Sequence, residues 1–95
     1  MANEVLKRQD VYSRIVKVIR EVLQFTHQET LSEINEQTNI GADLGIDSVE
    51  VLDVIGGLEK EFDLMLKPEI AGTKRVMSDL TDYIQELLQA KANKR

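Results

Sequence analysis

The sequence predicts an all-α domain, a small bundle of three to four helices with a long loop between the first two main helices. Apolar residues recur at helical spacing in three separate segments, and each segment forms one stripe. The chain has 95 residues, enough for one small core, and it has no cysteine, so no disulfide can support the fold. Apolar packing alone must hold such a chain together, which favours helices with many local contacts.

The first helix is predicted from about Val5 to Phe25, because its apolar residues form one amphipathic stripe. Lys17, Arg20 and Glu21 fall off this stripe and are expected to face water. The stripe consists of Val11, Ile15, Val18, Ile19, Val22 and Leu23.

A loop is predicted from Thr26 to Gly45, where turn-forming and polar residues replace the helical pattern. Leu31, Ile34 and Ile40 are scattered apolar residues that should anchor the loop to the core. A connection this long in a small domain is often functional.

The second helix is predicted to begin at Asp47 and Ser48, since both residue types cap helix N-termini. Glu50 in the first turn would interact favourably with the positive end of the helix dipole. The expected buried stripe is Val51, Leu52, Ile55, Leu58 and Phe62.

Pro68 ends any helix before it, and residues 69–75 are expected to form a short third helix. The last helix carries the stripe Val76, Leu80, Tyr83, Ile84, Leu87 and Leu88, with Ser78 as its expected cap. Met65 and Met77 are expected to fill the core. Residues 1–95 form one domain in this interpretation, with 1–4 and 91–95 frayed.

Composition argues against several classes of function. The net charge of −5 disfavours nucleic-acid binding. No apolar run approaches the length of a membrane span, and the first ten residues lack the apolar region of a signal peptide, so we expect a cytoplasmic protein. His27 is the only histidine, and no second group stands near it for catalysis, so we expect no enzyme and no catalytic residue.

Acids are concentrated between Asp43 and Asp63, where Lys60 is the only base. Such a block attracts basic partners and steers their approach, although a charge run is often no more than a solvated face. It does not form a calcium-binding EF-hand loop, because the twelfth position counted from Asp43 is Val54, and we expect no metal site.

The stretch from Asp43 to Glu50 indicates a modification site. Gly45 frees the backbone for a tight turn, and the apolar Leu44 and Ile46 on either side should reach into the core. Ser48 then emerges on the surface at a helix start, within reach of another enzyme. Free N–H groups there would favour a phosphate attached to its hydroxyl.

These residues resemble the acyl carrier protein family. The family pattern D-L-G-x-D-S-L is matched by Asp43-Leu44-Gly45-Ile46-Asp47-Ser48-Val49. The resemblance continues along the second helix to the L-E-x-E-F ending at Phe62. It returns in the last helix, which is similar to the pattern V-x-D-L-x-D-Y-I, at Val76, Asp79, Leu80, Asp82, Tyr83 and Ile84.

The resemblance implies a carrier and not an enzyme. A phosphopantetheinyl transferase would move 4'-phosphopantetheine from coenzyme A onto Ser48, beside Asp47, and acyl groups would be held as thioesters on this arm. Partner enzymes would bind the acidic second helix at Asp43, Val49, Glu50 and Asp53. The acyl chain would lie between the helices, in a pocket formed by Leu52, Ile55, Gly56, Gly57, Leu58, Leu80 and Ile84.

Gly56 and Gly57 depart from the family, which usually has larger residues there. Either a neighbouring helix or the side chain of Leu80 packs closely against them, or the missing side chains enlarge the acyl pocket. Departures of this kind make a specialised lipid or polyketide pathway at least as plausible as fatty acid synthesis. Two other functions stay open: an aminoacyl or peptidyl carrier, and an unmodified acidic helical adaptor in which Ser48 only caps a helix.

Overall fold

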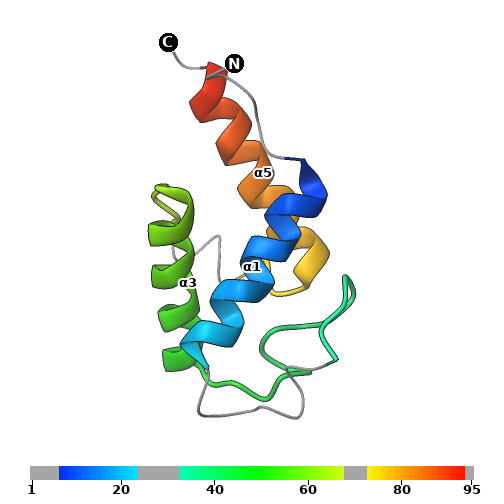
Figure 1. Cartoon of the computed structure of the whole chain (residues 1–95). Helices are drawn as coiled ribbons and strands as arrows, with labels where there is room; N and C mark the ends of the chain where they lie inside the picture. Colours follow the sequence, from blue (N-terminus) through cyan, green and yellow to red (C-terminus); the bar gives the residue numbers. More distant parts are fainter. Residues whose placement is uncertain (1–6, 24–32, 68–72, 94–95) are drawn as a thin grey trace.

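The computed structural model describes residues 7–23, 33–67 and 73–93. Within these ranges the fold consists of three helices, α1 (Arg8–Val22), α3 (Ser48–Phe62) and α5 (Met77–Asn93), and contains no β-strand (Figure 1). The all-α prediction is therefore confirmed. Helix α1 packs against both of the other helices.

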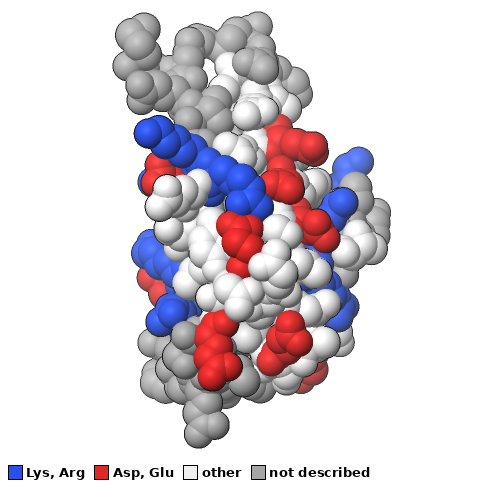
Figure 2. All heavy atoms as spheres, turned by 90° about the vertical axis from the view of Figure 1, so that its right-hand side faces the viewer, with Lys and Arg blue, Asp and Glu red and all other residues white. Residues whose placement is uncertain are grey.

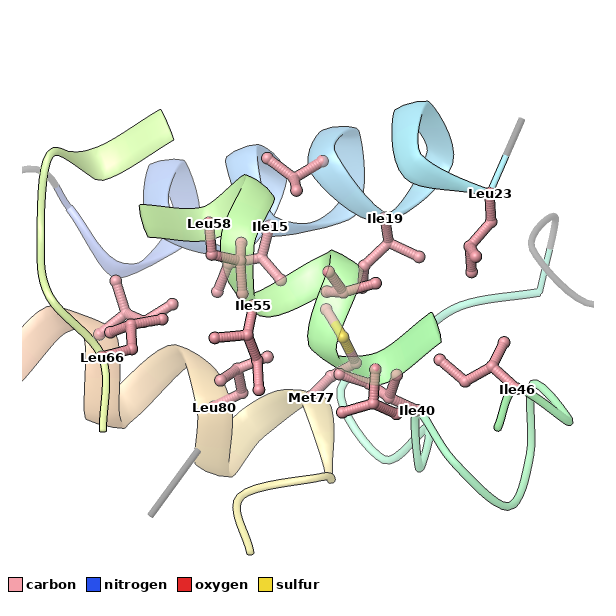
Figure 3. Close-up of a cluster of buried hydrophobic side chains, with 14 of the residues drawn as sticks. Ile15, Ile19, Leu23, Ile40, Ile46, Ile55, Leu58, Leu66, Met77 and Leu80 are labelled. Carbon is pink, nitrogen blue, oxygen red and sulfur yellow. The ribbon is translucent and has the colours of Figure 1, made fainter. Parts of the chain in front are cut away.

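The core lies where the three helices face one another. Ile15 and Ile19 of α1 point towards Ile55 and Leu58 of α3, and Met77 and Leu80 of α5 line the other side (Figure 3). Helix α1 buries four residues of its predicted stripe: Val11, Ile15, Val18 and Ile19. Leu44, Ile46 and Ile40 of the loop are also buried in this core, as the sequence predicts.

Three sequence predictions about the helices are wrong. Leu52 is 56% exposed, and Val54 takes its place in the buried stripe of α3. Met65 follows α3 and is 89% exposed, whereas Met77 is fully buried. Ser78 is not the cap of α5, because the helix already begins at Met77. Helix α5 continues to Asn93, and the expected fraying of residues 91–95 stays a prediction.

Some predictions fall outside the described residues. They include His27, Leu31, the first four residues and the last two. The predicted short helix over 69–75 is described only from Thr73, and residues 73–75 are not helical.

The loop before α3 is joined to the start of α5 by backbone hydrogen bonds. The N–H of Ile40 donates to the carbonyl of Arg75 at 2.7 Å, and the N–H of Met77 donates to the carbonyl of Thr38 at 2.8 Å. These bonds form an isolated antiparallel bridge between Asn39 and Val76. The bridge fixes the loop that leads to Ser48 relative to the bundle.

Arg8 forms a second tie between the same loop and the helices. Its guanidinium donates two hydrogen bonds to the carboxylate of Glu36, at 2.7 and 2.9 Å, and a third to Asp82 of α5 at 2.7 Å. The hydrogen bonds from Arg8 hold the pKa of the Glu36 carboxyl below its ordinary value. The loop is thus held by charge as well as by backbone pairing.

Candidate functional site

A tight turn around Gly45 precedes the start of α3. Gly45 has a φ of 70°, in the left-handed region that favours glycine, and its N–H donates to the carbonyl of Gly41 at 3.0 Å. The carboxylate of Asp43 accepts a hydrogen bond from the N–H of Asn39 at 2.8 Å. Leu44 and Ile46, on either side of the glycine, are both buried. They anchor the turn in the core as the sequence predicts.

Asp47 is the N-cap of α3. Its side chain accepts a hydrogen bond from the N–H of Glu50 at 2.8 Å, and the Glu50 side chain accepts one from the N–H of Asp47 at 3.1 Å. This reciprocal pair is a capping box. Because Asp47 performs the capping, the hydroxyl of Ser48 is not needed for it.

Ser48 is the first residue of α3 and is exposed. Its side chain makes no hydrogen bond with any residue that the structure describes. The first N–H groups of a helix have no intrahelical acceptor and carry partial positive charge. A phosphate bound to this hydroxyl would therefore fit the helix start, and a covalent phosphopantetheine arm would extend into solvent.

The predicted docking residues are only partly brought together. Val49 is 65% exposed, and Asp53 lies one turn further along the same side of α3. Glu50 is half-buried and takes part in the capping box, and Asp43 is exposed in the turn before the helix. Val49 and Asp53 thus share the surface next to Ser48, while the other two acids also stabilise local structure.

Leu52 lies on this same exposed surface. Its side chain is exposed, and the spacing of three from Val49 puts the two apolar side chains next to each other. Sequence reasoning missed this role because Leu52 and the buried Val54 are both apolar. The available signal was the spacing from Val49, which is next to the predicted attachment residue.

Four of the seven predicted pocket residues lie together in the core. Ile55 and Leu58 of α3 and Leu80 and Ile84 of α5 are all at least 93% buried and belong to one apolar cluster. Leu52 is exposed, and Gly57 packs against α1. The acyl pocket stays a prediction.

Gly57 is explained by close packing against α1. A Cβ built at this position would lie 2.8 Å from Cγ1 of Val18 and 3.2 Å from Cγ2 of Val22. The predicted alternative of a close neighbour is thus present, but the neighbour is α1 and not Leu80. A surface hollow of about 300 Å³ beside Gly57 is lined by the apolar side chains of Val18 and Val22 and by the charged side chains of Glu21, Lys60 and Glu61.

Basic side chains of α1 and α5 pair with acids, whereas Asp53 of α3 does not take part in such a pair within the described ranges. On the face drawn in Figure 2, basic and acidic side chains are intermixed, in spite of the net charge of −5. Arg8, Arg14 and Lys17 of α1 and Lys91 of α5 pair with acids. By contrast, Asp53 makes no ion pair or hydrogen bond with the residues that the structure describes, so its charge is available to a partner.

The chain is similar to known proteins along most of its length. The family model described as a phosphopantetheine attachment site matches residues 13–88. The chain is 32% identical to an acyl carrier protein of Trieres chinensis over 76 residues, which cover 80% of this chain and 90% of that protein. It is 27% identical over 79 residues to a mitochondrial acyl carrier protein of Saccharomyces cerevisiae, covering 83% and 63% of the two chains.

A third relative is a chloroplastic acyl carrier protein of Brassica napus, with 40% identity over 50 residues. That match covers 53% of this chain and 37% of the relative. The chain thus spans less than two thirds of the length of the yeast and Brassica proteins. No helix in the described ranges is long and apolar enough to cross a membrane.

Proposed function

This chain belongs to the acyl carrier protein family, and we propose that Ser48 is the residue to which its phosphopantetheine arm is attached. A member of this family holds acyl groups as thioesters on a covalent 4'-phosphopantetheine arm and is a carrier, not an enzyme. The observation that supports Ser48 is its exposed hydroxyl at the start of α3. Asp47 caps the helix, so this hydroxyl has no capping role.

The arm supplies the thiol that this chain lacks, since the sequence has no cysteine. The residues of the chain have simpler tasks. Leu44 and Ile46 anchor the turn, Asp47 fixes the first turn of α3, and Ser48 offers its Oγ for the phosphodiester bond. A tethered acyl group reaches each partner at high effective concentration, without new contacts for each reaction.

The test is phosphopantetheinylation followed by intact mass. Purified apo protein is incubated with coenzyme A and a broad-specificity phosphopantetheinyl transferase, alongside Ser48→Ala and Ser13→Ala. Ser13 is an exposed serine in α1 and serves as the matched control. We expect the wild type and Ser13→Ala to gain one phosphopantetheine and Ser48→Ala to gain none. A folded wild type that gains nothing would support the unmodified adaptor.

The family implies two kinds of partner, the transferase and the enzymes of acyl-chain synthesis. We propose that fatty acid synthesis is the pathway, because the relatives are named as acyl carrier proteins. A specialised lipid or polyketide pathway and aminoacyl loading are the alternatives. Loading the holo protein with malonyl or aminoacyl groups by the respective enzymes separates the acyl carrier from the aminoacyl carrier.

We also propose a monomer in the cytoplasm. Both parts of this proposal rest on the sequence, and the relatives include proteins named as mitochondrial and chloroplastic. Light scattering of the purified protein and fractionation of the source cells would test them.

A further inference from the structure

A large apolar side chain is exposed where the chain leaves α3. Met65 is 89% exposed, more than any other large apolar side chain in the described ranges. A surface hollow of about 300 Å³ lies beside it, and the apolar part of its lining comes from Leu64, Met65, Leu87 and Ala90. Adjoining apolar groups on a surface are typical of an interaction site, whereas isolated ones are common on any protein. The end of α3 is therefore a candidate binding surface.

Basic side chains surround Met65. Lys60 is in the last turn of α3 and Lys67 follows Met65 by two residues, and both lysines are exposed. Neither lysine makes an ion pair or hydrogen bond with a described residue, whereas bases of α1 pair with acids. Lys91 of α5 donates to the backbone carbonyl of Asp63 at 2.6 Å and to its carboxylate at 3.0 Å, which joins α5 to this end of α3. The surface formed by Lys60, Met65, Lys67 and Lys91 is called the α3 tip below.

The α3 tip and Ser48 lie at opposite ends of α3, and the charge near each end differs. Ser48 begins the helix, and Asp53, which has no ion pair with the described residues, lies in its first half. Phe62 ends the helix 14 residues later, about 21 Å along the axis at 1.5 Å per residue (Figure 1). A surface that binds the α3 tip would therefore leave the hydroxyl of Ser48 accessible to enzymes.

We propose that the α3 tip binds the surface of an anionic membrane, with Met65 among the lipid headgroups and the lysines beside it. This inference goes beyond the proposed carrier function and does not depend on attachment at Ser48. A negatively charged lipid surface attracts the lysines, whose apolar stems can lie along the boundary between headgroups and acyl chains. Basic residues next to exposed apolar ones are typical of proteins that bind a membrane without crossing it.

The shape and the charge of the α3 tip favour a lipid surface over an acidic protein. Met65 protrudes just after the end of a helix, and a fluid lipid surface receives such a side chain without a matching pocket. The net charge of −5 means that anionic lipid repels the rest of the molecule, so the α3 tip must face the membrane. The same repulsion makes the binding weak, and screening makes it sensitive to salt.

Tryptophan fluorescence provides the test, because the chain has no tryptophan of its own. Met65→Trp places the probe in the α3 tip, and Val49→Trp places it at an exposed position next to Ser48 as the control. Each protein is titrated at low salt with vesicles of phosphatidylglycerol and, separately, with vesicles of phosphatidylcholine. We expect the emission of Met65→Trp to shift to shorter wavelength with phosphatidylglycerol alone, to return at high salt, and not to shift for Val49→Trp.

Sedimentation with the same vesicles tests the chain without the added tryptophan. Wild type should sediment with phosphatidylglycerol vesicles, and Met65→Ser should sediment less. Lys67→Gln should lower the vesicle affinity about fivefold, the change that about 1 kcal/mol for one lysine at an anionic surface produces. Lys74→Gln removes a lysine outside the α3 tip and should leave the affinity unchanged.

Three results would overturn the inference. They are no binding of wild type to phosphatidylglycerol, equal binding to phosphatidylcholine, and an equal shift for Val49→Trp. Binding of soluble polyglutamate as tight as that of the vesicles, and unchanged in Met65→Ser, would instead assign the α3 tip to an acidic protein. None of these results bears on phosphopantetheinylation, so the attachment at Ser48 is tested separately.

Discussion

Replacing each of the two adjacent glycines of α3 by alanine should change stability in opposite directions. Both substitutions improve helix propensity by about 1 kcal/mol, because glycine is the more flexible residue in the unfolded chain. At Gly56 the new Cβ meets no described atom within 4 Å apart from its chain neighbours and the nearby backbone of α3, so the whole gain should appear. At Gly57 it would lie 2.8 Å from Cγ1 of Val18, closer than such atoms normally approach.

The magnitude at Gly57 follows from how little its neighbours can move. Val18 is 97% buried, and its branched side chain has one strongly preferred rotamer in a helix. Inserting a methyl group into a packed contact costs about 1–3 kcal/mol, and we take about 2 kcal/mol because Val22 is also close. The net effect of Gly57→Ala is then a loss of about 1 kcal/mol, against a gain of about 1 kcal/mol for Gly56→Ala.

Urea and thermal unfolding of the two variants provide the assay. For a chain of this size, about 1 kcal/mol corresponds to about 4–8 °C in Tm, so the two variants should differ by about twice that amount. Adding Val18→Ala should reduce the cost of Gly57→Ala, which a double-mutant cycle would detect. If both glycine variants were stabilised equally, the close packing of α1 on α3 would be refuted.

Three further predictions concern other contacts. Asp47→Ala removes the capping box with Glu50 and should cost about 1 kcal/mol in urea unfolding, whereas Ser48→Ala should cost much less; equal losses would contradict the capping role. Leu58→Ala should cost about 2–5 kcal/mol because this side chain is fully buried, and a smaller loss would indicate a core that collapses readily. The pKa of Glu36 is lowered because its ionised form pairs with Arg8. This pairing stabilises the fold at pH values above the ordinary pKa of 4.5, and the stabilisation is lost as the pH falls through the lower pKa of the folded state. Glu36→Gln should therefore be less stable than wild type at neutral pH but closer to it in acid; a constant difference would contradict the pairing.

The helices and the turn before Ser48 could be predicted because each has a local signal. The stripe of α1, the positive φ at Gly45 and the cap at Asp47 all follow from residue type and spacing. The motif around Ser48 is of the same kind, since its residues are consecutive. The features that the sequence predicts well are therefore those set by residues close together in the chain.

The predictions that failed depend on tertiary packing. Leu52 and Val54 are both apolar and two residues apart, so periodicity alone could not decide which of them faces the core. The neighbour of Gly57 is in α1, about 40 residues earlier in the sequence, and no local pattern marks it. The four predicted pocket residues that are buried together come from α3 and α5, and both of these helices pack against α1, which is distant from them in the sequence.

The bridge between Asn39 and Val76 joins two points of the chain that lie on either side of α3 in the sequence. It closes a loop that contains all of α3, so the ends of this loop are held together whatever lies between them. Closing a longer loop costs only slightly more entropy, about 0.6 kcal/mol for each doubling of its length. Insertions after the buried Leu66 and before Thr73 should therefore cost little entropy, whereas a deletion that removes Leu66 would also remove a core contact. A change that breaks the pairing at Ile40 or Met77 would instead leave the loop before Ser48 held by Arg8 and by the buried Leu44 and Ile46 alone.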